Sequence, residues 1–159
     1  MDMGDRVGPC AAPSSLTIAG EEQWAKVVGW ELGDEPEIVS ARLERVLAGH
    51  LCATANLMWL LEARGEPPPR AGDLRLLRCA EGRPRAVIEV IESHILPFDR
   101  VDEHFAADVG EGDLSLDYWR ATHERVFERQ CRDLGRRLDA AVPVVCVRFH
   151  VIYAPSSET

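Results

Sequence analysis

The chain has 159 residues, of which 46% are hydrophobic and 28% are charged, a balance typical of a globular domain. Its 18 basic and 27 acidic residues give a formal net charge of −9. This charge argues against sequence-independent binding to long duplex nucleic acid, because such binding depends on neutralising phosphates. No apolar stretch approaches the roughly 20 residues of a membrane-spanning helix, and no secretory signal precedes the first charged segments. We therefore expect a cytoplasmic protein without a membrane partner.

The two ends of the chain differ in composition from its middle. Residues 1–19 are rich in Gly, Pro, Ala and Ser and are predicted to form a disordered tail. Residues 155–159 are predicted to be a short polar tail. We expect a single domain over residues 20–154, since no repeat or linker divides it. Its first part, residues 21–34, is predicted to be a short helical or irregular segment.

The next segments follow the pattern of a helix, a short strand and a second helix. Pro36 suits the first turn of a helix, and Gly49 suits the left-handed residue that ends it. Residues 51–55 are short and tolerate a β conformation, and residues 56–65 are predicted to be helical. The apolar stripe of the first helix consists of Val39, Leu43, Val46 and Leu47.

The second half of the chain alternates strands and helices. Residues 73–79 and 85–98 are predicted to form two strands joined by a turn. A short helix is expected within residues 99–110 and a long one over residues 115–134. Residues 142–153 are rich in β-branched side chains and predict a final strand. This order predicts an α+β domain around a small mixed sheet or barrel.

The cysteines and histidines do not form a recognisable metal or redox motif. Neither a C-x-x-C pair nor an H-E-x-x-H spacing occurs, and no glycine-rich phosphate loop is present. We therefore expect no metal and no cofactor, and free thiols in a reducing compartment. The cysteines are Cys10, Cys52, Cys79, Cys131 and Cys146.

Several polar and aromatic residues have two readings. His123 lies in the apolar stripe of the long helix, which favours a core histidine over a general base. Trp119 and Tyr118 fit core aromatics better than a base-stacking platform. The acidic turn over residues 108–113 is equally compatible with a site carboxylate and with a solvated loop. Arg148, on the last strand, can receive an anion or pair with a carboxylate, and pairing is the favoured reading.

The order and spacing of several segments resemble those of the ASCH domain family, within the PUA-like superfamily. The resemblance runs roughly from Trp30 to Tyr153. It rests on "GWELGDEPEIVSARLERVLAGH", "CATANLMWLLEARGEPPPRAGDL", "VIEVIESHILPFDRVDEHFAADVGEGDLSLDYWRATH" and "VPVVCVRFHVIY". It implies an α+β fold, a PUA-like small mixed β-barrel flanked by helices, with a cleft over the loop that precedes Asn56. It also implies a ligand class, because ASCH domains are regarded as RNA-binding or RNA-processing modules.

The family signature G-x-K-x-x-[E/T]-x-R can be placed on this sequence. Gly49 and Thr54 match the signature glycine and threonine, whereas Leu51 and Asn56 replace the lysine and the arginine. Some members deacetylate an acetylated cytidine nucleoside with a lysine, a threonine and a later glutamate, and Glu111 corresponds best to that glutamate. Leucine can neither take a proton nor hold an oxyanion. The resemblance therefore leaves the amidohydrolase chemistry without its lysine.

Three functions follow as alternatives. The leading hypothesis is that RNA or a modified nucleoside or nucleotide binds in the cleft over residues 49–56, with no membrane or long duplex partner. The second is a nucleoside amidohydrolase or ribonuclease in which His50 replaces the missing lysine. The third is a non-catalytic regulatory domain. The catalytic candidates are Thr54, Glu111 and His50, and the binding candidates are Gly49, Asn56, Trp59, Trp119 and Arg148.

Overall fold

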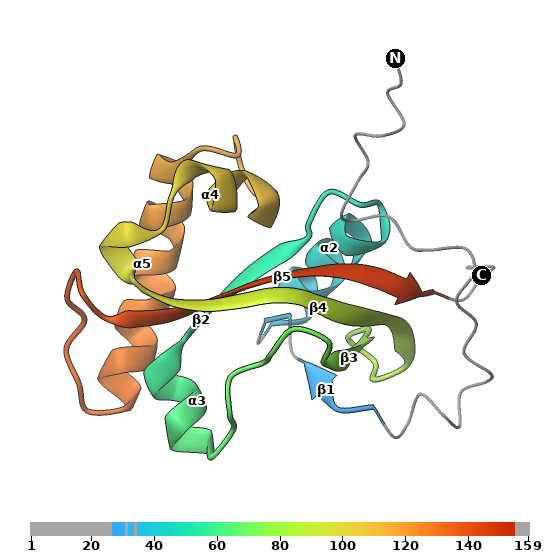
Figure 1. Ribbon diagram of the computed structural model, residues 1–159, viewed down its shortest axis with the longest axis horizontal. Helices are drawn as coiled ribbons and strands as arrows, with labels where there is room; N and C mark the ends of the chain where they lie inside the picture. Colours follow the sequence, from blue (N-terminus) through green and yellow to red (C-terminus); the bar gives the residue numbers. More distant parts are fainter. Residues whose placement is uncertain (1–26, 31, 34, 155–159) are drawn as a thin grey trace. The chain divides into compact units, whose positions relative to one another are not determined.

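The computed structural model describes residues 27–30, 32–33 and 35–154 (Figure 1). The predicted tails, residues 1–19 and 155–159, lie outside the described residues, so the boundaries of the domain stay a prediction. The chain divides into two compact units, and each is described by itself. Strands β4 and β5 contribute residues to both units.

The sheet is mixed and its strand order is β1-β3-β4-β5-β2. The pair β1–β3 is parallel, whereas β3–β4 and β2–β5 are antiparallel. The order is linear, with β1 and β2 as the two edge strands, so the sheet is open. A closed barrel would have no edge strands. The predicted α+β class with a small mixed sheet is confirmed. The strands are β1 Gly29–Trp30, β2 Ala53–Leu57, β3 Leu74–Arg78, β4 Pro84–Pro97 and β5 Pro143–Tyr153.

Unit 1 consists of Met1–Cys52, Ala71–Ile91 and Phe149–Thr159. Its helix α2, Pro36–Leu47, begins with a proline at the first helical position, as predicted. The apolar stripe of α2 reaches the core through Leu43 and Val46, which are 3% and 1% exposed. The core that they join also holds Leu32, Leu51, Leu77, Ala86, Ile88, Phe149 and Val151.

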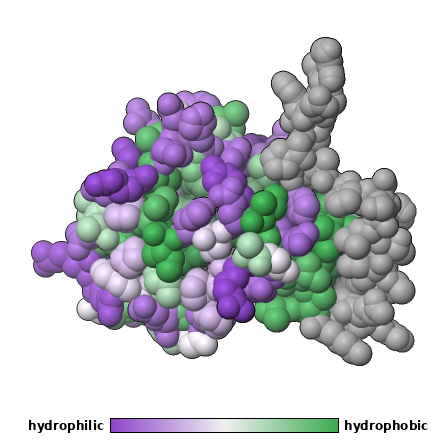
Figure 2. Space-filling model, viewed as in Figure 1, coloured by the Kyte–Doolittle hydropathy of each residue, from purple (hydrophilic) through white to green (hydrophobic). Residues whose placement is uncertain are grey.

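Unit 2 consists of Ala53–Arg70 and Glu92–Arg148 and contains most of the helices. Helices α4 and α5 pack against each other in this unit (Figure 1). Hydrophilic residues dominate the surface over α4 and α5 in Figure 2. The helical segments are α3 Met58–Arg64, the 3₁₀ turn η2 Phe98–Arg100, α4 Glu103–Val109 and α5 Leu116–Asp133.

Two predicted segments differ from the structure. The strand predicted over 51–55 lies at Ala53–Leu57, because antiparallel pairing with β5 extends through Asn56 and Leu57 before α3 begins. The segment over 21–34 contains the two-residue strand β1, which pairs with β3. In both places pairing with a distant strand decides the conformation, and local propensity does not contain that information.

Free thiols are found at Cys79, Cys131 and Cys146. The prediction of a free thiol is wrong at Cys52, which is disulfide-bonded, and Cys10 lies outside the described residues. Within the described part of the chain, no helix is long and apolar enough to cross a membrane. In the same residues, no three His, Cys, Asp or Glu side chains are grouped to hold a metal ion.

Candidate functional site

Strand β2 presents Thr54 and Asn56 on one of its faces. Successive side chains of a strand point to opposite faces, so residues 54 and 56 share a face that residues 53 and 57 do not. Ala53 and Leu57 are both 0% exposed and belong to the core of unit 2. Thr54 and Asn56 therefore point away from that core.

The strand register separates Thr54 from Arg148. Thr54 lies opposite Val147 in the β2–β5 pair, and Ala53 lies opposite Arg148. Directly opposed residues of an antiparallel pair project to the same face. Arg148 therefore shares the core face of β2 and β5 with Ala53, and Thr54 lies on the other face. Thr54 and Arg148 thus lie on opposite faces of the β2–β5 pair within unit 2.

The side chains of Thr54 and Asn56 have hydrogen-bonding capacity that the described protein does not use. Thr54 Oγ1 is one of five buried side-chain nitrogen or oxygen atoms in the described residues without a hydrogen-bond partner. Asn56 is half-buried, and its amide makes no hydrogen bond to another described residue. A buried hydroxyl without a partner costs roughly 1–3 kcal/mol, which a bound ligand or water can offset.

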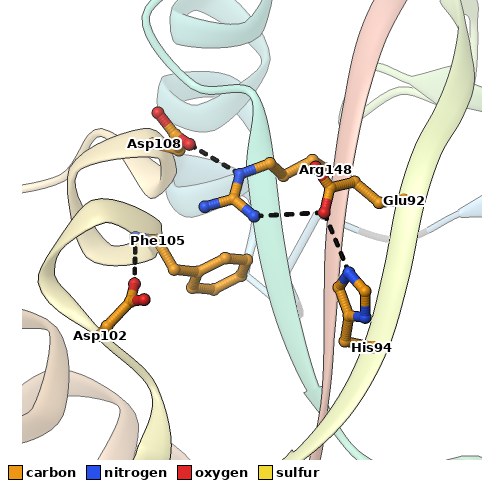
Figure 3. Close-up of polar contacts among 6 residues, drawn as sticks. All are labelled: Glu92, His94, Asp102, Phe105, Asp108 and Arg148. Atoms are coloured by element: carbon orange, nitrogen blue, oxygen red, sulfur yellow. Dashed lines mark hydrogen bonds and ion pairs between the residues drawn. The ribbon is translucent and has the colours of Figure 1, made fainter.

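On the core face, Arg148 is the centre of a polar cluster (Figure 3). Its Nε donates to Asp108 Oδ2 at 2.8 Å, and its Nη1 lies 3.6 Å from Glu92 Oε1. The same Glu92 oxygen lies 3.0 Å from His94 Nε2. The guanidinium carbon lies 5.3 Å from the centre of the Phe105 ring. The favoured reading of Arg148, pairing with a carboxylate, is confirmed.

The cluster joins strand β4, strand β5 and helix α4 within unit 2. Helix α4 is fixed at its start by Asp102, whose Oδ1 accepts a hydrogen bond from Phe105 N at 2.9 Å (Figure 3). Because one arginine faces two carboxylates, the cluster carries a net charge of about −1 when His94 is neutral. Such a cluster favours a ligand with N–H donors over a phosphate.

The loop between α4 and α5 carries Glu111, which is half-buried. The carbonyl of Glu111 accepts a hydrogen bond from Leu114 N at 3.0 Å, and Leu114 has a left-handed φ of 69°. Hydrogen bonds from Ser115 lower the pKa of the Asp113 carboxyl, whose Oδ1 lies 3.0 Å from Ser115 N. Ser115 then caps α5 by accepting from Tyr118 N at 3.1 Å. The loop that carries Glu111 is therefore held by hydrogen bonds within it and at the start of α5.

Trp119 is a core residue, only 2% exposed. It is stacked on His123, with ring centres 4.4 Å apart, and on Phe98, with ring centres 5.6 Å apart. His123 Nδ1 lies 3.0 Å from the carbonyl of Trp119, so the expected core histidine is found. The rings of Phe98 and His123 agree with the favoured reading of a core aromatic, and the stacking of Trp119 on a ligand stays a prediction.

The remaining predicted residues are distributed over both units. Trp59, on α3 in unit 2, is half-buried, and the guanidinium of Arg136 lies 4.2 Å from its ring centre. Gly49 and His50 belong to unit 1, where Gly49 has a left-handed φ of 82° and His50 is exposed. Leu51, at the signature lysine position, is 2% exposed in the apolar core of unit 1.

Sequence reasoning missed Glu92 and His94. These residues are two apart on β4, so they project to one face. The alternation of this strand is imperfect in the sequence, and the position of Arg148 beside it depends on strand order. Asp108 was part of the predicted acidic turn, and its partner was not predictable for the same reason.

A comparison of the chain with known proteins identifies its family. The ASCH domain family model matches residues 29–153. The chain is similar to the crystal structure of an ASCH domain from Lactobacillus crispatus JV V101, with 27% identity, 88% of each chain covered and a TM-score of 0.75. It is also similar to the crystal structure of protein EF3133 from Enterococcus faecalis V583, with 26% identity and a TM-score of 0.72. That match covers 79% of this chain and 76% of the other.

No curated protein matches the chain in sequence. The two structural neighbours agree with the expected fold class, a PUA-like α+β arrangement with a mixed sheet and helices. The family match covers most of the residues that the structure describes. The chain belongs to the ASCH domain family.

Proposed function

We propose that this chain binds a nucleoside or an unpaired RNA base at β2. Thr54 and Asn56 supply the hydrogen bonds, and Glu111, from the loop after α4, and Trp59, from α3, are proposed further contacts. The observation that carries the proposal is the pair of polar side chains on one face of β2, with Thr54 Oγ1 buried and without a described partner. A buried site that is built to hydrogen-bond a polar ligand discriminates strongly against ligands that lack the matching groups.

The charges of the chain favour a base over a phosphate at this site. The net charge is −9, and Arg148 projects to the opposite face of the β2–β5 pair, where it pairs with Asp108 and Glu92. Asn56 occupies the position where the signature has an arginine, and its amide offers both a donor and an acceptor. An amide of this kind suits the edge of a nucleobase.

The proposal is tested by calorimetric titration with cytidine, uridine, adenosine, guanosine and N4-acetylcytidine. We expect at least one nucleoside to bind and its affinity to fall in Thr54→Val and Asn56→Ala. Thr122→Val is the matched control, because the Thr122 hydroxyl bonds the carbonyl of Tyr118 at 2.8 Å on α5. Absence of binding across this panel at millimolar concentration would refute the proposal.

A second candidate is hydrolysis of an acylated nucleoside or of RNA, with Thr54, Glu111 and His50. The buried hydroxyl of Thr54 favours it, since a desolvated hydroxyl becomes a nucleophile when a base takes its proton. The burial of Leu51 in an apolar core weighs against it, because the position of the signature lysine then contributes to packing and offers no amine to the reaction. Release of acetate from N4-acetylcytidine that is lost in both Thr54→Ala and His50→Ala would support it, and turnover that survives both changes would exclude it.

A further inference from the structure

A cavity of about 470 Å³ lies in unit 2 beside α5, and its lining includes none of the residues of the proposed nucleoside site. Its walls are the exposed side of α5, the 3₁₀ turn η2 and the segment over residues 136–140. Backbone hydrogen bonds of 2.9 Å from Asp99 N to Ala140 O and from Phe98 N to Val142 O hold two of these walls together. The cavity is within the size range of small-molecule sites.

Three arginines gather at one end of this cavity, at the C-terminal end of α5. Arg132 lies in the last turn of α5, and Arg136 and Arg137 follow its end. Within the described residues, the side chains of Arg132 and Arg137 form no ion pair or hydrogen bond, and the guanidinium of Arg136 packs on the ring of Trp59. Arg120, at the other end, already donates to the carbonyls of Asp99 and Val101 at 3.2 and 3.3 Å.

A structural role accounts for only part of this arrangement. Basic residues near a helix C-terminus interact favourably with the helix dipole, and Arg132 fits that role. The effect falls off within the last turn, however, and Arg136 and Arg137 lie beyond the end of the helix at Asp133. The two arginines after the helix therefore need another explanation.

The contact between Arg136 and Trp59 connects the cavity to the proposed nucleoside site. Helix α3 starts at Met58, directly after β2, and places Trp59 three residues beyond Asn56. The Arg136 guanidinium, which also lines the cavity, lies 4.2 Å from the centre of the Trp59 ring. Trp59 is therefore connected to β2 through the chain and to Arg136 through its ring, and these residues and the other two arginines all belong to unit 2.

We infer that Arg132, Arg136 and Arg137 form a phosphate subsite, and that the ligand of this protein is a short single-stranded RNA whose backbone enters the cavity. The inference rests on the proposed function, which places a base at Thr54 and Asn56. Arginine suits the role because its planar guanidinium binds phosphate oxygens through two parallel hydrogen bonds. Single-stranded RNA combines such backbone contacts with stacking on aromatic rings.

Acidic residues limit what the subsite accepts. Glu128 and Glu124 line the same cavity, one and two helical turns before Arg132, and neither side chain forms an ion pair or hydrogen bond within the described residues. Their charge repels a phosphate, so the cavity favours one phosphate at the arginine end and disfavours a highly charged duplex. Removing one of these carboxylates should therefore strengthen phosphate binding, whereas removing an arginine should weaken it.

The test uses fluorescence anisotropy of the full chain with a 5′-fluorescein-labelled cytidine pentaribonucleotide. We expect Arg132→Gln and Arg137→Gln each to weaken binding about threefold to fivefold, the range of a solvent-exposed charge contact. Glu128→Gln should strengthen binding. Arg125→Gln is the matched control, because Arg125 is an exposed arginine on α5 that does not line the cavity.

Salt dependence gives a second measure. Neutralisation of one phosphate of a single strand predicts that affinity falls about 2.5-fold between 50 and 200 mM salt, and loss of that contact should make affinity nearly independent of salt. Unchanged affinity and salt slope in Arg132→Gln and Arg137→Gln would overturn the subsite.

Cytidine and inorganic phosphate separate this inference from the proposed function. Cytidine binding should fall in Thr54→Val and not in Arg137→Gln, because cytidine has no phosphate. Weak inorganic phosphate binding should show the opposite dependence. If only the phosphate dependence is found, the anion site stands and the base site is wrong. If only cytidine dependence is found, or if no anion binds, the phosphate subsite is wrong.

Discussion

Replacement of Thr54 by valine is expected to stabilise the ligand-free protein and to weaken its complex. Valine has nearly the shape of threonine and removes only the hydroxyl. Thr54 Oγ1 is buried and has no hydrogen-bond partner within the described residues, so its removal relieves a desolvation cost of roughly 1–3 kcal/mol. A gain of about 1 kcal/mol should raise Tm by about 2–4 °C for a chain of this size.

The effect on the complex should have the opposite sign. A neutral hydrogen bond contributes about 1 kcal/mol net, so loss of the hydroxyl should weaken nucleoside binding about fivefold. Thermal unfolding followed by circular dichroism measures the first quantity, and calorimetric titration measures the second. In Thr122→Val, which removes a hydrogen-bonded hydroxyl on α5, stability should fall slightly and affinity should not change.

Two outcomes would refute this reasoning. If Thr54→Val lowers the free energy of unfolding by more than about 1 kcal/mol, the hydroxyl is hydrogen-bonded in the ligand-free protein and is not available to a ligand. If stability rises while affinity for every bound nucleoside stays constant, the hydroxyl is unpaired but lies outside the binding site. Either result would remove the observation on which the proposed function depends.

Two further predictions concern the loop after α4 and the cluster on β5. Gly112→Ala should lower the free energy of unfolding, measured by thermal unfolding, by about 1–3 kcal/mol more than Gly82→Ala does. Both glycines have a left-handed φ, but only at Gly112 would an added Cβ overlap a ring, that of Tyr118. Equal losses of stability in the two variants would contradict this close contact. A double-mutant cycle of Arg148→Met and Asp108→Asn, measured by thermal unfolding, should give a coupling free energy of about 0.5–1 kcal/mol. This coupling should decrease with salt, since both side chains are partly exposed. A coupling of zero in low salt would show that the ion pair does not form.

The sequence predicted most elements of the fold because their apolar patterns are local. The stripe of α2 and the apolar side of α5 are each visible in the order of residues, and Leu43, Val46 and Phe127 are buried as that pattern requires. Gly65, the last residue of the helix predicted over residues 56–65, ends α3 with a left-handed φ of 69°. Local patterns were sufficient wherever one helix contributes one face to a core.

The candidate site was less predictable because it depends on strand register. A shift of one residue in the β2–β5 pair would move Thr54 to the face of Arg148, and no local signal in the sequence specifies that register. Trp119 shows the same limit, since its position on α5 was evident but the stacking of Phe98 and His123 on its ring was not. The residues around Arg148 come from segments far apart in the sequence.

Leu114 has a consequence for how this chain tolerates sequence change. A leucine in the left-handed region costs about 1–2 kcal/mol relative to a glycine, and this one is 47% exposed, so it recovers little of that cost by burial. Folding alone would favour glycine or asparagine at position 114. A library of variants at position 114 that is selected only for thermal stability should therefore lose leucine in favour of glycine or asparagine. Retention of leucine in a library selected for ligand affinity would show that its side chain contacts the ligand.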